Sequence, residues 1–111
     1  MKPLNLLSGH DELILLVVLS LEHNAYSTTI RREVSAVTGR EWSIGAVYDP
    51  LYRLEKRGLI QSSLSRPIKE RGGRSRRMFS VRKEGLDALV AHKSVRDLLW
   101  LGLNHLSFSR G

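Results

Sequence analysis

Cysteine is absent from this chain of 111 residues, and its absence removes several chemistries at once. A chain without thiols has no disulfides, no thiolate zinc or iron–sulfur site and no cysteine nucleophile. Such a composition is typical of a reducing compartment, so we expect a cytoplasmic location. The most apolar stretch, Leu13 to Leu21, is far shorter than the roughly 20 residues that cross a bilayer. The N-terminal residues also lack the apolar run and cleavage site of a secretory signal, so we expect no association with a membrane.

Patterns typical of enzymes and metal sites are missing too. The four histidines, His10, His23, His92 and His105, lie far apart and show no spacing of metal ligands. The sequence contains no paired-carboxylate motif, no phosphate-binding glycine loop and no nucleophile elbow. We therefore expect a protein that is not an enzyme and needs neither a cofactor nor a metal.

The chain does carry a concentrated positive charge. Its formal net charge is +7, and 41% of its residues are apolar, which is enough for a folded core. Residues 53–83 contain 11 basic and two acidic side chains, whereas the other 80 residues have a net charge of −2. Charge that served solubility would be dispersed over the surface. A located basic stretch on a folded domain instead indicates a surface that binds a polyanion.

Apolar periodicity predicts two helices in the first third of the chain. Residues 10–23 are apolar almost all round, which is typical of a helix that is central or lies at a subunit interface. Residues 27–37 place Ile30, Val34 and Val37 on one face. Ser27 or Thr28 is a candidate cap for this second helix, and Gly39 is expected to end it.

A third helix is expected to begin after Ser43, which is a good N-cap, and to stop at Gly58. Ile44, Val47, Leu51 and Leu54 form its apolar stripe. The face away from this stripe offers small and polar side chains, namely Gly45, Asp49, Tyr52, Arg53 and Lys56, with Tyr48 on its flank. Pro50 lacks an amide hydrogen, and we expect it to kink the helix.

The period then changes to that of strands. Residues 59–65 and 78–81 read as two strands of a hairpin, joined by a connection with six basic residues and the pair Gly72-Gly73. A last helix is expected over Glu84–Leu103. Three helices, a hairpin and a helix predict a mainly α fold with a small β-hairpin. We assign residues 1–82 to a winged helix-turn-helix domain and residues 83–111 to a long C-terminal dimerisation helix and tail.

This arrangement predicts which residues contact DNA. A helix that enters the major groove needs small or polar residues near its N-terminus so that its backbone can approach the bases. Ser43 and Gly45 meet this need, and Tyr48, Tyr52 and Arg53 follow them. Basic residues of the hairpin, or wing, are suited to phosphates or to a minor-groove edge. The candidate wing residues are Lys69, Arg71, Gly73, Arg74, Arg76 and Arg77.

Three blocks of sequence resemble the PadR family of transcriptional regulators. The first is Glu12-Leu13-Ile14-Leu15-Leu16 with Ala25-Tyr26 and Ile30-Arg31-Arg32-Glu33-Val34. The second joins Ser43-Ile44-Gly45-Ala46-Val47-Tyr48 to Leu51-Tyr52-Arg53-Leu54-Glu55-Lys56-Arg57-Gly58-Leu59-Ile60. The third is Arg71-Gly72-Gly73-Arg74 with Phe79 and Glu84-Gly85-Leu86. Departures from the family pattern include Ser27 in place of a glycine, Asp49 between Tyr48 and Pro50, and Arg82-Lys83 in place of Thr-Pro.

The resemblance implies a dimeric winged-helix repressor that binds double-stranded DNA at a palindromic operator. It adds Tyr26 and Ser27 to the candidate DNA-binding residues. It also implies a homodimer, for which the apolar surplus of the first and last helices supplies the interface. Family members often respond to small hydrophobic or aromatic effectors, and Trp100 is the candidate ligand residue in the last helix.

Two other readings fit the same residues. In one, the domain is a ligand sensor centred on Trp100 and its DNA function is secondary. In the other, the winged helix docks proteins and has no sequence-specific affinity for DNA. Salt-sensitive binding to DNA separates the repressor from the second of these alternatives.

Overall fold

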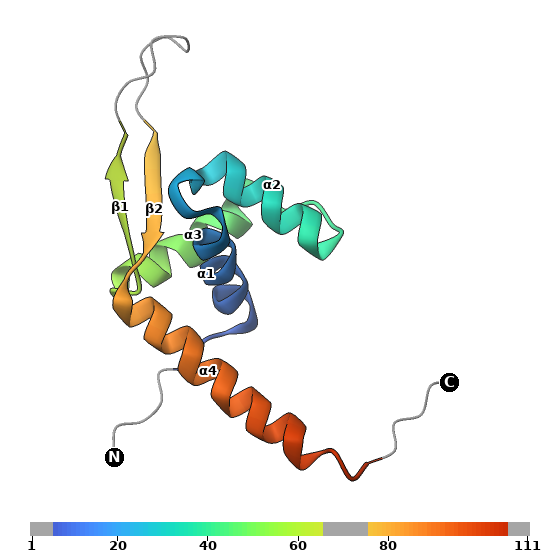
Figure 1. Cartoon of the computed structure of the whole chain (residues 1–111). Helices are drawn as coiled ribbons and strands as arrows, with labels where there is room; N and C mark the ends of the chain where they lie inside the picture. The colour runs from blue at the N-terminus through green and yellow to red at the C-terminus, as the bar shows by residue number, and fades with distance from the viewer. Residues whose placement is uncertain (1–5, 66–75, 107–111) are drawn as a thin grey trace.

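The computed structural model describes residues 6–65 and 76–106, and all structural statements below refer to these ranges (Figure 1). The elements run in the order α1 (Gly9–Leu21), the short 3-10 helix η1 (Glu22–Asn24), α2 (Ser27–Thr38), α3 (Ile44–Lys56), β1 (Ile60–Leu64), β2 (Arg77–Val81) and α4 (Lys83–Gly102). The two strands form one antiparallel sheet. The fold class expected from the sequence, mainly helical with a small hairpin, is confirmed.

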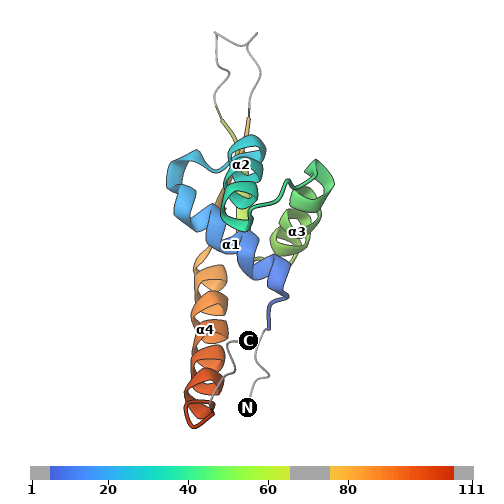
Figure 2. The same cartoon turned by 90° about the vertical axis from the view of Figure 1, so that its right-hand side faces the viewer.

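Helix α1 lies at the centre of the molecule and contacts α2, α3, β2 and α4 (Figure 2). Ile14, Leu15 and Val18 of α1 are fully buried among apolar residues of α2, α3 and the strands. Burial of each such side chain contributes about 1.5–3 kcal/mol of hydrophobic stabilisation. Leu16 and Leu19, in contrast, remain exposed on the side of α1 that faces α4 and solvent. The expectation of a central first helix is therefore met, with one apolar strip left uncovered.

Local signals fix most helix ends. The Ser8 hydroxyl accepts from the Asp11 amide at the start of α1, and the Ser43 hydroxyl accepts from the Ala46 amide at the start of α3. Gly39 ends α2 in the left-handed conformation, with φ of 70°. Both the Ser43 cap and the Gly39 stop agree with the sequence-based expectation.

Two expected boundaries are wrong. Helix α1 ends at Leu21, two residues early, because Glu22 adopts a positive φ of 52° and the chain continues as η1. The residue that caps α2 is Tyr26 rather than Ser27 or Thr28. Here the Thr29 hydroxyl accepts from the Tyr26 amide and donates to the Asn24 carbonyl. The side chain of the third helical residue therefore bonds to the backbone that precedes the helix.

Helix α3 runs without interruption through Pro50, whose ring is buried. Ile44 and Val37 are exposed although the apolar stripes placed them in the core. Each lies at one end of its helix. Periodicity identified the correct faces of α2 and α3 but overstated how far the core extends along them.

The sheet is short and joined closely to the helices. Ile60 pairs with Val81 and Leu64 with Arg77, which fixes the register. The turn from α3 into β1 passes through Gly58 at a φ of 75°, a conformation that glycine adopts without a Cβ clash. On its other edge, β2 meets the segment before α2, because the Phe79 amide donates to the Ala25 carbonyl over 2.8 Å.

Helix α4 leaves the body of the domain and extends away from it (Figure 1). Its first turn packs where Gly85 lies against the Leu59 carbonyl. Its second half is apolar and exposed: Leu98 is 70% and Trp100 is 60% accessible to solvent. No helix within the described ranges is long and apolar enough to cross a membrane.

Candidate nucleic-acid interface

The turn between α2 and α3 is held by the side chain and backbone of Trp42. The Trp42 amide donates to the Ser35 hydroxyl over 3.1 Å, and its indole Nε1 donates to the Thr38 hydroxyl over 3.0 Å. Arg31 Nε donates to the Trp42 carbonyl over 2.6 Å. The indole is buried, with the His10 ring 5.2 Å away between centroids. Trp42 is therefore a packing residue that fixes the position of the turn before α3.

Helix α3 exposes the side that lies away from the core. Ser43, Gly45, Asp49, Tyr52 and Lys56 are all exposed on it. An added Cβ at Gly45 would meet no atom within 4 Å, so nothing in the fold requires glycine there. A glycine costs roughly 0.5–1 kcal/mol relative to alanine inside a helix. The packing of the described residues therefore does not explain why position 45 is a glycine.

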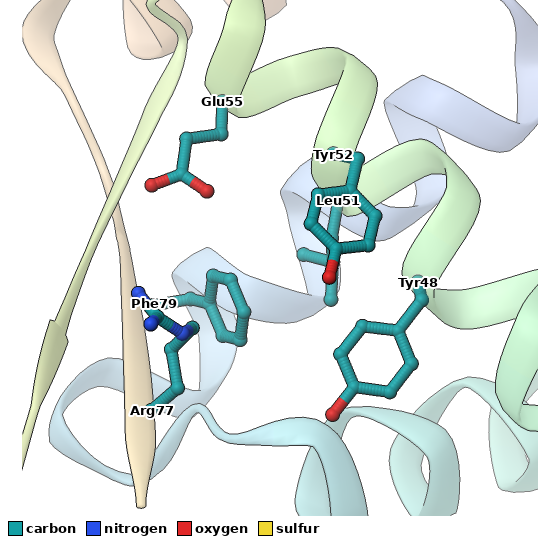
Figure 3. Close-up of a pocket in the computed structure, with 6 residues that line it drawn as sticks. All are labelled: Tyr48, Leu51, Tyr52, Glu55, Arg77 and Phe79. Atoms are coloured by element: carbon teal, nitrogen blue, oxygen red, sulfur yellow. The ribbon is translucent and has the colours of Figure 1, made fainter.

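A cleft of about 500 Å³ separates α3 from the wing strand β2 (Figure 3). The Tyr48 and Tyr52 rings form one wall, with centroids 6.0 Å apart and planes inclined by 29°. Phe79 and Arg77 approach from β2, and Glu55 approaches from the last turn of α3. Two phenol groups and one guanidinium thus line a concave surface between the two elements expected to contact DNA.

The start of α2 is bound to the base of the wing. The Arg76 guanidinium lies 4.3 Å from the centre of the Tyr26 ring, within the range of a cation–π contact. Tyr26 also forms an isolated antiparallel bridge with Met78. Tyr26 and Ser27 are both half-buried. The structure therefore brings Tyr26, Ser27 and Arg76 together from segments far apart in the sequence.

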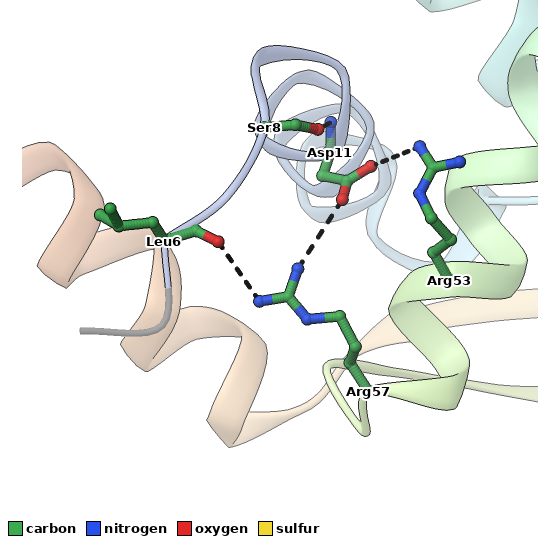
Figure 4. A network of polar contacts seen from close by, with 5 residues as sticks. All are labelled: Leu6, Ser8, Asp11, Arg53 and Arg57. Atoms are coloured by element: carbon green, nitrogen blue, oxygen red, sulfur yellow. Dashed lines mark hydrogen bonds and ion pairs between the residues drawn. The ribbon is translucent and has the colours of Figure 1, made fainter. Parts of the chain in front are cut away.

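Arg53 has a different partner from the one its exposed position suggested. Its Nη2 lies 2.9 Å from Asp11 Oδ1, and Arg57 Nη1 lies 3.7 Å from Asp11 Oδ2 (Figure 4). Arg57 Nη2 also donates to the Leu6 carbonyl over 3.4 Å. The Asp11 side chain is only 6% exposed, and those of Arg53 and Arg57 are 54% and 30% exposed. One buried acid at the start of α1 thus holds two cations of α3.

The predicted residues fall into four groups. Ser43, Gly45, Tyr48, Tyr52 and Arg53 share α3. Tyr26 and Ser27 join Arg76 and Arg77 at the wing base. The wing residues Lys69, Arg71, Gly73 and Arg74 lie outside the described residues. Trp100 lies on the far half of α4, away from the cleft and from α3.

Sequence reasoning missed three residues of this region. Asp11, Glu55 and Ser62 were not among the candidate residues, although the Ser62 hydroxyl bonds to both Glu55 and Arg77. Glu55 did carry a signal, because it is one of two acids within the basic stretch of residues 53–83. Ser62 and Asp11 carried no such signal, since their partners lie on other elements. Within the described ranges, no cluster of three or more potential metal ligands is present.

Comparison with known proteins identifies the fold. A PadR-like transcription factor from Bacteroides fragilis superposes with a TM-score of 0.71 at 20% identity, over 87% of this chain and 88% of the other. A PadR-like regulator from Bacillus cereus gives a TM-score of 0.67 at 22% identity, over 85% and 86%. A solved complex of hsRosR gives a TM-score of 0.62 at 28% identity, over 88% and 78%.

At the level of sequence, no curated protein matches the chain. The model of one family does match it, over residues 15–91, which is most of its length. This span includes the Trp42 turn, the exposed face of α3, the cleft and the first half of α4. The chain belongs to the PadR-like family of transcriptional regulators.

Proposed function

We propose that the chain is a cytoplasmic, homodimeric repressor that binds a palindromic operator on double-stranded DNA. The observation that carries the proposal is the outer face of α3, which combines the open backbone at Gly45 with Ser43, Tyr52 and Lys56. A helix with this face fits a major groove that is about 12 Å wide. Because the family consists of transcriptional regulators, we assign contact with DNA to this face.

The basic stretch of residues 53–83 supplies the part of the DNA affinity that does not depend on the base sequence. Residues 53–83 hold 11 basic side chains, and all but Arg57, Arg82 and Lys83 belong to α3 or to the hairpin that follows it. Contacts to phosphates orient a protein on the duplex, while base contacts specify the site. The ridge of the DNA backbone between major and minor grooves fits between α3 and the wing, where Tyr48, Tyr52 and Arg77 line the cleft.

A second copy of the chain accounts for the uncovered apolar surface. Leu16 and Leu19 of α1 and Leu86, Leu89 and Val90 of α4 line a groove of about 470 Å³. The apolar end of α4 is exposed as well, and a 20-residue helix is roughly 30 Å long. A two-fold dimer through α1 and α4 covers both surfaces. It also sets two α3 helices against half-sites about one turn of DNA apart.

A small hydrophobic or aromatic effector is the proposed regulator. Trp100 lies beside Leu99 and Leu101 on the exposed half of α4, so a dimer encloses it in an apolar setting. A planar ligand that stacks on the indole there would alter the relation between the two DNA-binding domains. Unchanged ligand affinity in Trp100→Ala would show that Trp100 is not part of the ligand site.

Fluorescence anisotropy tests the proposed DNA binding. The labelled duplex carries the region upstream of the protein's own gene, and an unlabelled random duplex of equal length serves as competitor. We expect a preference for the upstream region of at least about a thousandfold, which is the low end for specific DNA-binding proteins. Equal affinity for both duplexes at moderate salt would reject the repressor. No salt-sensitive binding to either duplex would favour a winged helix that docks proteins.

Light scattering tests the dimer separately. Val90→Asp introduces a charge into the exposed groove without touching the buried core, so we expect it to convert a dimer into a folded monomer. Lys93→Ala, on the rim of the same groove, is the control and should leave the dimer intact. A wild-type chain that is monomeric at every concentration would contradict the interface.

A further inference from the structure

Ser62 joins α3 to strand β2 of the wing through two hydrogen bonds. Its hydroxyl donates to Glu55 Oε2 over 2.6 Å and accepts from Arg77 Nη1 over 3.0 Å. A serine hydroxyl offers one donor and can accept at the same time, so it suits a position between an acid and a base. Both bonds include a charged group, which makes them stronger than bonds between neutral groups.

The topology explains how the three side chains meet. Strand β1 leaves α3 through the tight turn at Gly58, so its third residue, Ser62, faces the last turn of the helix. Ser62 pairs with Phe79 across the sheet. Arg77 lies two residues before Phe79 and therefore on the same face of β2, diagonally across from Ser62. The register of the hairpin therefore places Arg77 within hydrogen-bond distance of Ser62.

The carboxylate of Glu55 and the guanidinium of Arg77 are joined through Ser62 rather than directly. Glu55 and Arg77 form no direct ion pair in the described part of the chain, although both line the cleft (Figure 3). Glu55 lines the cleft in which the DNA backbone is proposed to lie. A carboxylate in that place repels phosphate unless a cation offsets it. Ser62 provides the link by which Arg77 does so.

We infer that Glu55, Ser62 and Arg77 form a positioning relay that sets the angle between the wing and α3, so that both elements engage one DNA backbone together. Ser62 is the positioning residue of this relay, since it acts through its two partners. The part of the inference that concerns DNA rests on the proposed function. The part that concerns the wing angle does not, and it can be measured without DNA.

The wing angle is tested by the distance between two spin labels. The chain has no cysteine, so cysteines introduced at Lys56 and Leu64, both exposed, are the only labelling sites. We expect a narrow distance distribution in the parent protein and a clearly broader or shifted one with Ser62→Ala. Ser62→Thr keeps the hydroxyl and should restore the narrow distribution. Ser63→Ala removes a hydroxyl from the other face of the same strand and is the matched control.

Three results would overturn the relay. They are an unchanged distribution in Ser62→Ala, an equal change in Ser63→Ala, and a failure of Ser62→Thr to restore the parent distribution. Arg77→Gln removes the cation instead of the hydroxyl and should broaden the distribution as Ser62→Ala does. This second variant keeps the test decisive if Ser62→Ala folds poorly.

DNA affinity tests the functional part. We expect Ser62→Ala to weaken binding to the upstream duplex by about three- to tenfold, with Ser62→Thr near wild type. In the Arg77→Gln background, Ser62→Ala should have little further effect, because the two residues act through one link. Additive losses would show that Ser62 does not act through Arg77. Absence of binding by the wild type would reject the proposed function, and the label distances would still decide the relay.

Discussion

Arg53 Nη2 lies 2.9 Å from Asp11 Oδ1, and this contact ties α3 to the first turn of the central helix α1. The Asp11 side chain is buried, and Arg57 approaches its second oxygen. A buried carboxylate is tolerated when charged donors satisfy it. These contacts tie α3 to α1, whereas the Ser62 relay links α3 to the wing.

Asp11→Asn should destabilise the fold by about 1–2 kcal/mol. Loss of one partner of a fully buried pair costs about 3–5 kcal/mol, but both guanidiniums here reach solvent and recover part of that by hydration. Urea unfolding measures the change as a lower midpoint at constant slope. Asp87→Asn, at an exposed site on α4, is the control. Equal midpoints for the two variants would contradict a structural role for the Asp11 cluster.

Two glycines of α4 should respond in opposite directions to alanine. A Cβ at Gly85 would lie 2.2 Å from the Leu59 carbonyl oxygen, so the first turn of α4 must shift. We expect Gly85→Ala to cost about 1–3 kcal/mol, the usual penalty of overpacking. Gly102 has open space around its position, and alanine there should be neutral or slightly stabilising. Thermal unfolding of both variants measures the two changes in stability. Destabilisation of both variants would contradict the prediction.

Two substitutions of Gly45 should separate its effect on the free energy of unfolding from its effect on DNA affinity. Because its position is open, Gly45→Ala should raise the free energy of unfolding by about 0.5–1 kcal/mol through helix propensity. Gly45→Gln places a long side chain on the same surface and should weaken binding to the upstream duplex by at least about tenfold. Gly9→Ala, also in open space at the start of α1, is the control for DNA affinity. Wild-type affinity in Gly45→Gln would remove α3 from the groove.

The wing cations should determine the salt dependence of binding. Each phosphate contact adds close to one unit to the slope of log affinity against log salt. Arg71→Gln and Arg74→Gln, singly, should each lower the slope by about 0.9 if that side chain contacts a phosphate. Arg32→Gln changes an exposed cation on α2 and controls for general charge. A slope that falls equally in all three variants would indicate non-specific attraction rather than a wing contact.

Local signals in the sequence were sufficient for the elements of the fold. Ser43 and Gly39 mark helix ends because their preference arises from a cap hydroxyl and a left-handed backbone, both of which act within a few residues. The change of period after Gly58 located the hairpin for the same reason. Failures occurred where a tertiary contact decides the outcome, as at Tyr26, which caps α2 while it pairs with Met78.

The candidate site was predictable only as a list of exposed residues. Helical spacing placed Gly45, Tyr52 and Arg53 outside the core, and the structure agrees. It could not show that Arg53 faces Asp11, because that contact depends on how α1 crosses α3. The role of Ser62 depends in the same way on strand register, which spacing along one strand does not reveal.

The hydrogen bond between Phe79 and Ala25 has a consequence for the order in which the molecule assembles. These residues lie about half the chain apart, and contacts of such separation are slow to form because a long loop must close first. Helices α1, α2 and α3 pack through shorter loops, and a chain under synthesis presents them to one another before β2 exists. The nascent protein can therefore fold its helix-turn-helix early. The cleft between α3 and β2 can form only after β2 has been synthesised, so it forms later than the packing of the three helices.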